Sequence, residues 1–219
     1  MAKNENNARF NMLEQQVRPS DVLNPRVLDA FDKIDRKLFV EDYLVGLAYA
    51  DTALPIGFGQ VMLSPVTQGR MLQALDVKTH ETVLEIGTGN GYFTALLAQL
   101  AQQVISVEIV PELSVGAQQC FEKRNINNVT FAIGDASKAW VLPDRVDVIV
   151  ITAAFVLVPE AYFHALKVGG RMLAVVGEAT MMTAQLITRV SEREWQTQSM
   201  FETVIPPMVN AEPQPEFEF

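Results

Sequence analysis

The segment VLEIGTGNGYFTALLA, which starts at Val83, joins an apolar run to a helical run through a loop that contains three glycines. The apolar run Val83 to Ile86 is typical of a short buried parallel strand, and the spacing from Tyr92 to Leu100 predicts a helix packed against it. Glycines allow positive φ angles and let a ligand approach the backbone without meeting a Cβ atom. The three are Gly87, Gly89 and Gly91. The segment therefore predicts an α/β fold with a ligand pocket at this turn.

The spacing of the loop and the acidic residue before it indicate which ligand fits. A dinucleotide-binding loop has one more residue before its last glycine, so that a pyrophosphate rests on the helix N-terminus. Here the spacing is G-x-G-x-G, and Glu85 precedes the loop. A carboxylate repels a pyrophosphate, but it can hold the ammonium group of a methionine moiety directly or through water. We therefore predict S-adenosylmethionine, and not a nicotinamide cofactor, as the ligand.

Two further acidic residues follow apolar runs downstream. Glu108 ends a run about twenty residues after the glycine loop, where nucleotide-binding α/β folds place a carboxylate on ribose hydroxyls. Asp135 ends the next run and can accept a hydrogen bond from an adenine amino group. Open α/β sheets bind ligands at the C-terminal ends of their strands, so the three acids are expected to line one crevice.

The rest of the chain continues the alternation of strand and helix patterns. Val146 to Thr152 and Arg171 to Val176 predict a fourth and a fifth central strand, with a helix near Glu160 to Leu166 between them. Alternating apolar and polar residues from Thr183 to Val190, and around Ser199 to Ile205, predict two antiparallel strands at the sheet edge. The expected fold class is α/β, a doubly wound, mostly parallel, Rossmann-like sheet with antiparallel C-terminal strands.

The first part of the chain is expected to be helical. Apolar spacing is helical from Asn7 to Leu47, and Pro25 is suited to the first turn after Asn24. A loop rich in Gly and Pro, ALPIGFGQVMLSP, precedes a helix from about Thr67 to Leu75, and loops in this position often cover a site. We expect one compact unit with three parts: an N-terminal helical segment with a substrate-side loop (1–78), a cofactor-binding α/β domain (79–210) and an acidic tail (211–219).

Composition favours a soluble enzyme over several other classes. A hydrophobic content of 49% suffices for a core, and the net charge of -9 without a basic stripe argues against nucleic acid as a partner. The N-terminal residues lack an apolar targeting core, and no apolar run reaches membrane-spanning length, so we expect a cytoplasmic protein with no membrane partner. A single cysteine, Cys120, and the two histidines His80 and His164 predict neither a disulfide framework nor a metal site.

Beyond these motifs, the sequence resembles the protein-L-isoaspartate O-methyltransferase family from about Arg26 to Val209. The resemblance is carried by RVLDAFDKIDRKLFV, YADTALPIGFGQ and VLEIGTGNGY, and it continues in DVIVITAA, VGGRMLAVVGE and FETVIPPMV. It implies an S-adenosylmethionine-dependent O-methyltransferase with a Rossmann-like fold. The implied reaction is protein repair: methyl transfer to a carboxylate of damaged, isoaspartyl protein, with S-adenosylhomocysteine as the product.

The resemblance and the residue pattern together predict the members of the site. The cofactor-binding residues come from the glycine loop and two later strand ends: Glu85, Ile86, Gly87, Thr88, Gly89, Asn90, Gly91, Tyr92, Glu108, Ile109, Gly134, Asp135 and Ala136. The substrate-side residues come from the preceding loop and from the end of the fourth strand: Ile56, Gly57, Val61, Leu63, Thr152, Ala153 and Ala154. Gln60 and Ser64 are the candidate catalytic residues.

One departure from the family concerns the loop that would hold the reacting carboxylate. The family follows its Gly-Gln with Thr-Ile-Ser, and the serine hydroxyl is associated with that carboxylate. After Gln60, this chain has Val61 and Leu63 in the threonine and serine positions. Ser64 lies one residue later and would face the opposite way in an extended segment, so only a local bulge or turn would bring it into the pocket.

Three functions are compatible with the sequence. The leading interpretation is a carboxyl methyltransferase of the isoaspartyl type, with an isoaspartyl protein or peptide as its partner. The missing hydroxyls leave a second interpretation open, a methyltransferase of the same fold that acts on a small molecule, an RNA or another protein group. The third is a binding module that keeps the cofactor without turnover. The sequence does not predict the oligomeric state.

Overall fold

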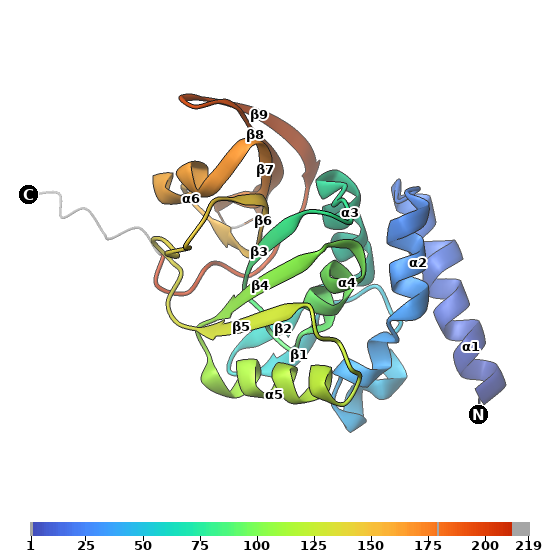
Figure 1. Cartoon of the computed structure of the whole chain (residues 1–219). Helices are drawn as coiled ribbons and strands as arrows, with labels where there is room; N and C mark the ends of the chain where they lie inside the picture. Colours follow the sequence, from blue (N-terminus) through green and yellow to red (C-terminus); the bar gives the residue numbers. More distant parts are fainter. Residues whose placement is uncertain (1, 179, 212–219) are drawn as a thin grey trace, which may run out of the picture.

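A central sheet organises the computed structural model, which describes residues 2–178 and 180–211 (Figure 1). Its seven strands are β3 (Thr82–Ile86), β4 (Gln103–Glu108), β5 (Val129–Ile133), β6 (Val146–Phe155), β7 (Leu166–Glu178), β8 (Met181–Ser191) and β9 (Glu194–Glu202). They are arranged in the order β5-β4-β3-β6-β7-β8-β9. The predicted acidic tail lies outside the described residues, apart from Ala211.

The pairing of the strands confirms the predicted fold class. Strands β5, β4, β3, β6 and β7 are parallel, whereas β8 and β9 are antiparallel to their neighbours. The last strand was placed too late by the sequence pattern, since it begins at Glu194 and not around Ser199. Most of its side chains are exposed at the sheet edge, so it has no clear apolar alternation from which to predict its start.

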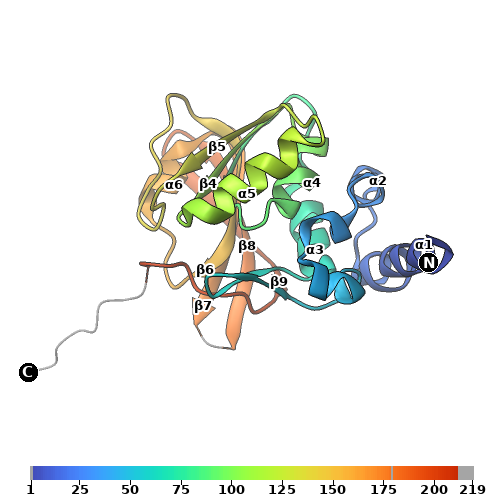
Figure 2. The same ribbon diagram turned by 90° about the horizontal axis from the view of Figure 1, so that it is seen from below.

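Helices cover both faces of the sheet. The helices α3 (Pro65–Leu75), α4 (Tyr92–Leu100) and α5 (Pro111–Glu122) lie on one face, and α6 (Glu160–Ala165) lies on the other (Figure 2). Alternate residues of a strand point to opposite faces, so Val83 of β3 belongs to the core under α3 and α4, and Leu84 to the core under α6. Among the described residues, no helix has the length and apolarity needed to cross a membrane.

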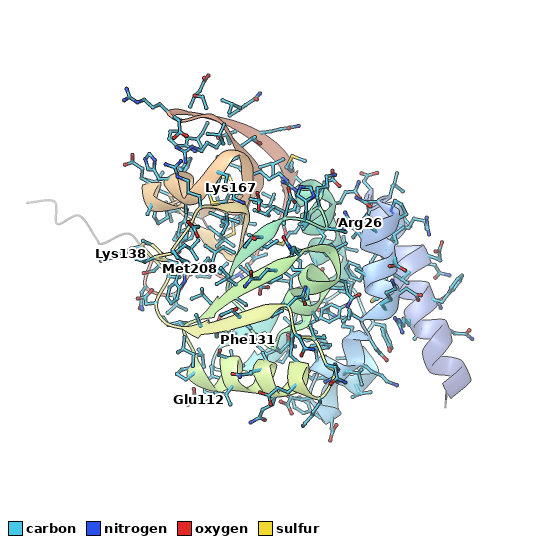
Figure 3. The ribbon with its side chains drawn as sticks, in the orientation of Figure 1. Arg26, Glu112, Phe131, Lys138, Lys167 and Met208 are labelled. Atoms are coloured by element: carbon cyan, nitrogen blue, oxygen red, sulfur yellow. The ribbon has the colours of Figure 1, made fainter. Side chains whose placement is uncertain are left out.

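The N-terminal segment is helical but interrupted. It contains α1 (Ala2–Asn11), a π-helical stretch (Met12–Val17), α2 (Pro25–Lys33) and three short 3-10 helices (Arg18–Ser20, Arg36–Phe39 and Asp42–Leu47). The start of α2 is as predicted, because Asn24 caps it by accepting a hydrogen bond from the Arg26 backbone at 2.9 Å and Pro25 occupies its first turn. The guanidinium of Arg26 (Figure 3) donates to the carbonyl oxygens of Val77 at 2.6 Å and Leu100 at 2.8 Å, which ties α2 to the sheet domain.

The loop rich in Gly and Pro folds as a hairpin and not as an irregular loop. Its strands are β1 (Leu54–Gly57) and β2 (Gln60–Met62), which pair antiparallel. Three consecutive residues at the tip, from Gly57 to Gly59, have positive φ angles, a conformation that glycine supplies without strain. The hairpin leads directly into α3, which starts two residues before the predicted Thr67, at Pro65.

Candidate active site

A pocket opens at the C-terminal ends of β3, β4, β5 and β6. This position is the one at which open α/β sheets bind ligands. Sixteen of the predicted site residues line it: Ile56, Gln60, Val61, Leu63, Ile86, Gly87, Thr88, Gly89, Asn90, Glu108, Ile109, Gly134, Asp135, Ala136, Thr152 and Ala153. The structure thus brings the predicted cofactor side and the predicted substrate side into one continuous cavity.

The glycine loop is shaped by the strand beside it. Gly87 has a φ of +97°, and a Cβ atom at this position would lie 2.2 Å from the Thr152 hydroxyl. That hydroxyl donates to the carbonyl oxygens of Ile86 at 3.0 Å and Gly87 at 2.8 Å, so it holds the end of β3 against β6. Thr152 lies where the pairing of β6 with β7 is irregular, between Val150 and Ala154, and such bulges re-aim side chains beside active sites.

Glu108 connects the end of β4 to the glycine loop. Its carboxylate accepts hydrogen bonds from the backbone N–H groups of Gly89 at 2.8 Å and Val110 at 3.0 Å, one on each oxygen. The side chain is only 5% exposed, but it lines the pocket. Each carboxylate oxygen can accept more than one hydrogen bond, so Glu108 can also accept hydrogen bonds from the hydroxyl groups of a ribose.

Asp135 joins the pocket to the C-terminal segment of the described chain. Its carboxylate accepts from the Ser137 backbone at 2.8 Å and from the Asn210 side-chain amide at 2.9 Å, and these hydrogen bonds lower the pKa of Asp135. The segment from Pro206 to Val209 lines the pocket and exchanges backbone hydrogen bonds of 2.8 Å with Ala154 of β6. We call residues 206–210 the strap, because this segment forms part of the pocket wall and is held by hydrogen bonds to Ala154 and to Asp135.

Glu85 is predicted to hold the ligand directly or through water, but the structure places it behind the pocket wall. Its side chain is completely buried and does not line the pocket. One oxygen accepts from Ser106 at 2.5 Å and Thr94 at 2.6 Å, and the other has no partner among the described residues. Burial raises the pKa of Glu85 to about 8, although the two hydroxyls lower it. The hydroxyl of Thr88, which is on the pocket wall, lies 2.6 Å from the hydroxyl of Ser106. The hydroxyl groups of Thr88 and Ser106 therefore lie between Glu85 and the cavity.

Ser64 is also misplaced by the sequence reasoning, because it is the N-cap of α3 and not part of the pocket wall. Its hydroxyl accepts from the Thr67 backbone at 3.3 Å and lies 3.2 Å from the Thr67 hydroxyl. The bulge that would turn Ser64 inward does not occur, since the chain enters the helix instead. The valine and leucine in the family's hydroxyl positions, Val61 and Leu63, do line the pocket.

Four other predicted residues lie off the wall of the pocket for local reasons. Gly57 is at the hairpin tip, and Ala154 faces a neighbouring groove. Gly91 packs against α5, since a Cβ atom there would lie 3.0 Å from the Cβ of Ala117. Tyr92 is completely buried with its ring 5.0 Å from the Arg36 guanidinium.

Eight further residues of the pocket wall were not predicted from the sequence. They are Met62, Gln68, Phe93, Val107, Pro206, Pro207, Met208 and Val209. Met62 and Val107 are neighbours in the sequence of predicted site residues, so they could have been predicted together with them. Gln68 and the strap were not, because only the tertiary fold brings them to the pocket, although most of the strap belongs to FETVIPPMV, a segment that resembles the family.

The parallel sheet, the glycine loop after β3 and the carboxylate at the end of β4 define a Rossmann-like, S-adenosylmethionine-dependent methyltransferase. The chain belongs to the protein-L-isoaspartate(D-aspartate) O-methyltransferase family, whose model matches residues 6–212. This confirms the resemblance, the enzyme class and the cofactor predicted from the sequence.

Relatives and solved structures agree with this assignment. The chain is 42% identical to the protein-L-isoaspartate O-methyltransferase of Syntrophus aciditrophicus, over 84% of each chain. It is 37% identical to that of Shewanella oneidensis, over 91% of this chain and 94% of the relative. A Plasmodium falciparum structure described as a beta-aspartate methyltransferase with S-adenosyl-L-homocysteine has a TM-score of 0.78 at 18% identity, covering 90% of this chain and 96% of its own. At that identity the structure establishes the fold alone.

Removing the Glu108 carboxylate is expected to weaken cofactor binding. Hydrogen bonds to a charged group contribute about 1.5–3 kcal/mol, so Glu108→Ala should lower the affinity for S-adenosylhomocysteine roughly 10- to 100-fold. Isothermal titration calorimetry measures this directly. Glu112→Ala is the matched control, since Glu112 lies on α5, away from the segment that carries Met208 (Figure 3), and should bind like the wild type. Equal affinities of the two variants would remove Glu108 from the binding site.

Proposed function

We propose that this chain methylates the free α-carboxylate of L-isoaspartyl residues in proteins or peptides, with S-adenosylmethionine as the methyl donor. The observation that carries the proposal is the single cavity that joins the glycine loop and Glu108 to Gln60 of the hairpin and to Leu63, the residue that follows the hairpin. Family membership and the names of the relatives support the same acceptor.

The chemistry demands positioning more than proton transfer. When bound, S-adenosylmethionine supplies an electrophilic methyl group on a sulfonium. A carboxylate acceptor has an ordinary pKa near ~4, so it is already ionised at neutral pH and needs no general base. The protein therefore has to align the carboxylate oxygen with the methyl group and exclude water. Ile56, Val61 and Leu63 give the cavity an apolar side that suits water exclusion.

The surroundings of the pocket favour an acceptor that is part of a longer chain. A second groove adjoins the pocket and shares Val61 and residues 206–208 with it. It continues past Ala154 at the end of β6 and Met182 at the start of β8. Such an apolar groove can take the residues that flank a modified position in a peptide, whereas a small-molecule acceptor would leave it unused.

The proposed function is tested with methyl-labelled S-adenosylmethionine and two synthetic peptides that differ only in an isoaspartyl or an aspartyl linkage. We expect label in the isoaspartyl peptide and background label in the aspartyl peptide. The product is a base-labile methyl ester, so loss of the label as methanol at alkaline pH identifies the bond. An enzyme that binds S-adenosylhomocysteine but does not label the isoaspartyl peptide would refute the proposal.

A second candidate function rests on the apolar residues at positions 61 and 63. Because Val61 and Leu63 line the pocket without a hydroxyl, a different methyl acceptor is the alternative reading of this site. Methyl incorporation into other proteins, RNA or small molecules, with none into the isoaspartyl peptide, would favour it. Cofactor binding without turnover on any acceptor would favour the binding module.

The cytoplasmic location stays a prediction.

A further inference from the structure

We propose that Gln68 is the carboxylate-positioning residue of this chain, in place of the hydroxyl that the family carries at position 63. Its Nε2 amide would donate a hydrogen bond to the acceptor carboxylate. The inference rests on the proposed function and deepens it, since it names the group that recognises the substrate. Gln68 lies in α3 and lines the pocket together with Leu63, the residue in the serine position.

The contact that supports this role is made with a buried arginine. Arg36 donates from Nη1 to the Oε1 of Gln68 at 2.6 Å and from Nη2 to the carbonyl oxygen of Leu63 at 2.7 Å. One guanidinium therefore holds both the glutamine and the backbone of the residue that lacks the hydroxyl. Arg36 is 0% exposed and Gln68 is 2% exposed, so neither bond competes with bulk solvent.

The arginine also settles which way the amide of Gln68 faces. A guanidinium has only donors, so its partner at 2.6 Å has to be the carbonyl oxygen of the amide. The Nε2 group, with two N–H donors, is then at the opposite end. Nε2 makes no hydrogen bond to any residue in the described part of the chain. Because Gln68 lines the pocket, these donors are the ones it offers to a ligand.

Arg36 is held firmly enough to act as the anchor. Its guanidinium lies 5.0 Å from the centre of the Tyr92 ring, and Tyr92 in turn packs edge-on against Phe31 and Phe39. Burial lowers the pKa of Arg36 to about 10, which still leaves it protonated at neutral pH. The cation therefore keeps its donors toward Gln68 and Leu63.

Gln60, the other glutamine of the pocket, lacks this support. Its side chain is more exposed, and it makes no hydrogen bond to a described residue that would orient its amide. Val61, Met62 and Leu63 contribute no side-chain donor to the wall. Of the side chains at the hairpin end of the pocket, Gln68 is thus the oriented donor among the described residues.

Two substitutions at position 68 test the proposal in the full chain. Gln68→Leu removes the donor and should lower kcat/KM for the isoaspartyl peptide 10- to 100-fold, mainly through KM for the peptide. Gln68→Glu keeps the shape but places a carboxylate against the substrate carboxylate, and should lower kcat/KM more than 100-fold. Affinity for S-adenosylhomocysteine should stay within twofold of the wild type in both. Gln119→Leu, on the exposed side of α5, is the matched control with unchanged kinetics.

A rescue experiment distinguishes recognition of the carboxylate from a structural role. In the Gln68→Leu background, Leu63→Ser restores a hydroxyl on the same pocket wall and should recover at least fivefold in kcat/KM for the isoaspartyl peptide. A folded double variant that binds S-adenosylhomocysteine and recovers nothing would overturn the shared role. Wild-type kinetics of Gln68→Leu would overturn the inference alone, whereas a wild type that never labels the peptide would overturn the proposed function as well.

Discussion

Gly87→Ala is expected to lower the affinity for S-adenosylhomocysteine at least 100-fold. Residue 87 has a φ of +97°, a conformation that costs a residue with a Cβ atom about 1–3 kcal/mol. The new methyl group would also lie 2.2 Å from the Thr152 hydroxyl, so Thr152 has to move and give up its two hydrogen bonds to the end of β3. Both residues line the pocket, and calorimetry on the folded variant measures the loss.

Two companion variants separate the causes of that loss. Gly116→Ala lies in α5, where the added Cβ meets nothing within 4 Å in the described part of the chain apart from the backbone of its own helix. It should therefore bind normally and gain up to ~1 kcal/mol in stability. In the pair Gly87→Ala with Thr152→Ala the hydroxyl is gone, and the nearest remaining Thr152 atom is the Cβ at 3.6 Å. This double variant should recover part of the affinity and retain the loss due to backbone strain. Wild-type affinity of Gly87→Ala alone would contradict the packing of the loop described above.

The second large effect concerns Glu85 and the pH dependence of stability. Burial raises its pKa in the folded chain to about 8, well above its ordinary value near ~4.3. The folded state therefore holds a proton that the unfolded state releases, and this contribution to stability is fully present below about pH 4 and is lost as the pH rises toward 8. The slope is about 1.4 kcal/mol per pH unit within that window, so the total is several kcal/mol.

Glu85→Gln removes this titration while it keeps the shape of the side chain. Urea titrations give the unfolding free energy of the wild type and of the variant at each pH. As the pH rises from 5 to 9, we expect the stability of the variant relative to that of the wild type to increase by several kcal/mol. Glu122→Gln, on the exposed surface of α5, should show a difference that stays constant within about 0.5 kcal/mol. A flat difference for Glu85→Gln would mean that the buried carboxyl is ionised throughout that range.

The parts of the fold that could be predicted are those in which local sequence alone decides the structure. Val83 to Ile86, the glycine loop and α4 follow from apolar runs and turn chemistry, and the end of β4 at Glu108 follows from the same pattern. The start of the edge strand β9 could not be placed by this reasoning, because the residues of its first half are mostly exposed and show no apolar alternation. Local patterns therefore predict the sheet up to its edge.

The site was less predictable, because several of its properties depend on the environment that the fold creates. Nothing in the motif shows that Glu85 turns toward Thr94 and Ser106, since that depends on how α4 and β4 pack on β3. Ser64 caps a helix whose start the sequence pattern placed too late. Arg36 and Gln68 are 32 residues apart, and no local pattern connects them. Long-range pairs of this kind require the tertiary structure.

The strap has a consequence for the order in which the protein matures on the ribosome. Synthesis proceeds from the N-terminus, so the glycine loop, β4 and β5 leave the exit tunnel long before Pro206 and Asn210. A nascent chain can form its parallel sheet while one wall of the cavity is still inside the ribosome. Ribosome-bound chains from which β8 has emerged but residues 206–210 have not should therefore bind the methyl donor more weakly than chains from which the strap has emerged as well.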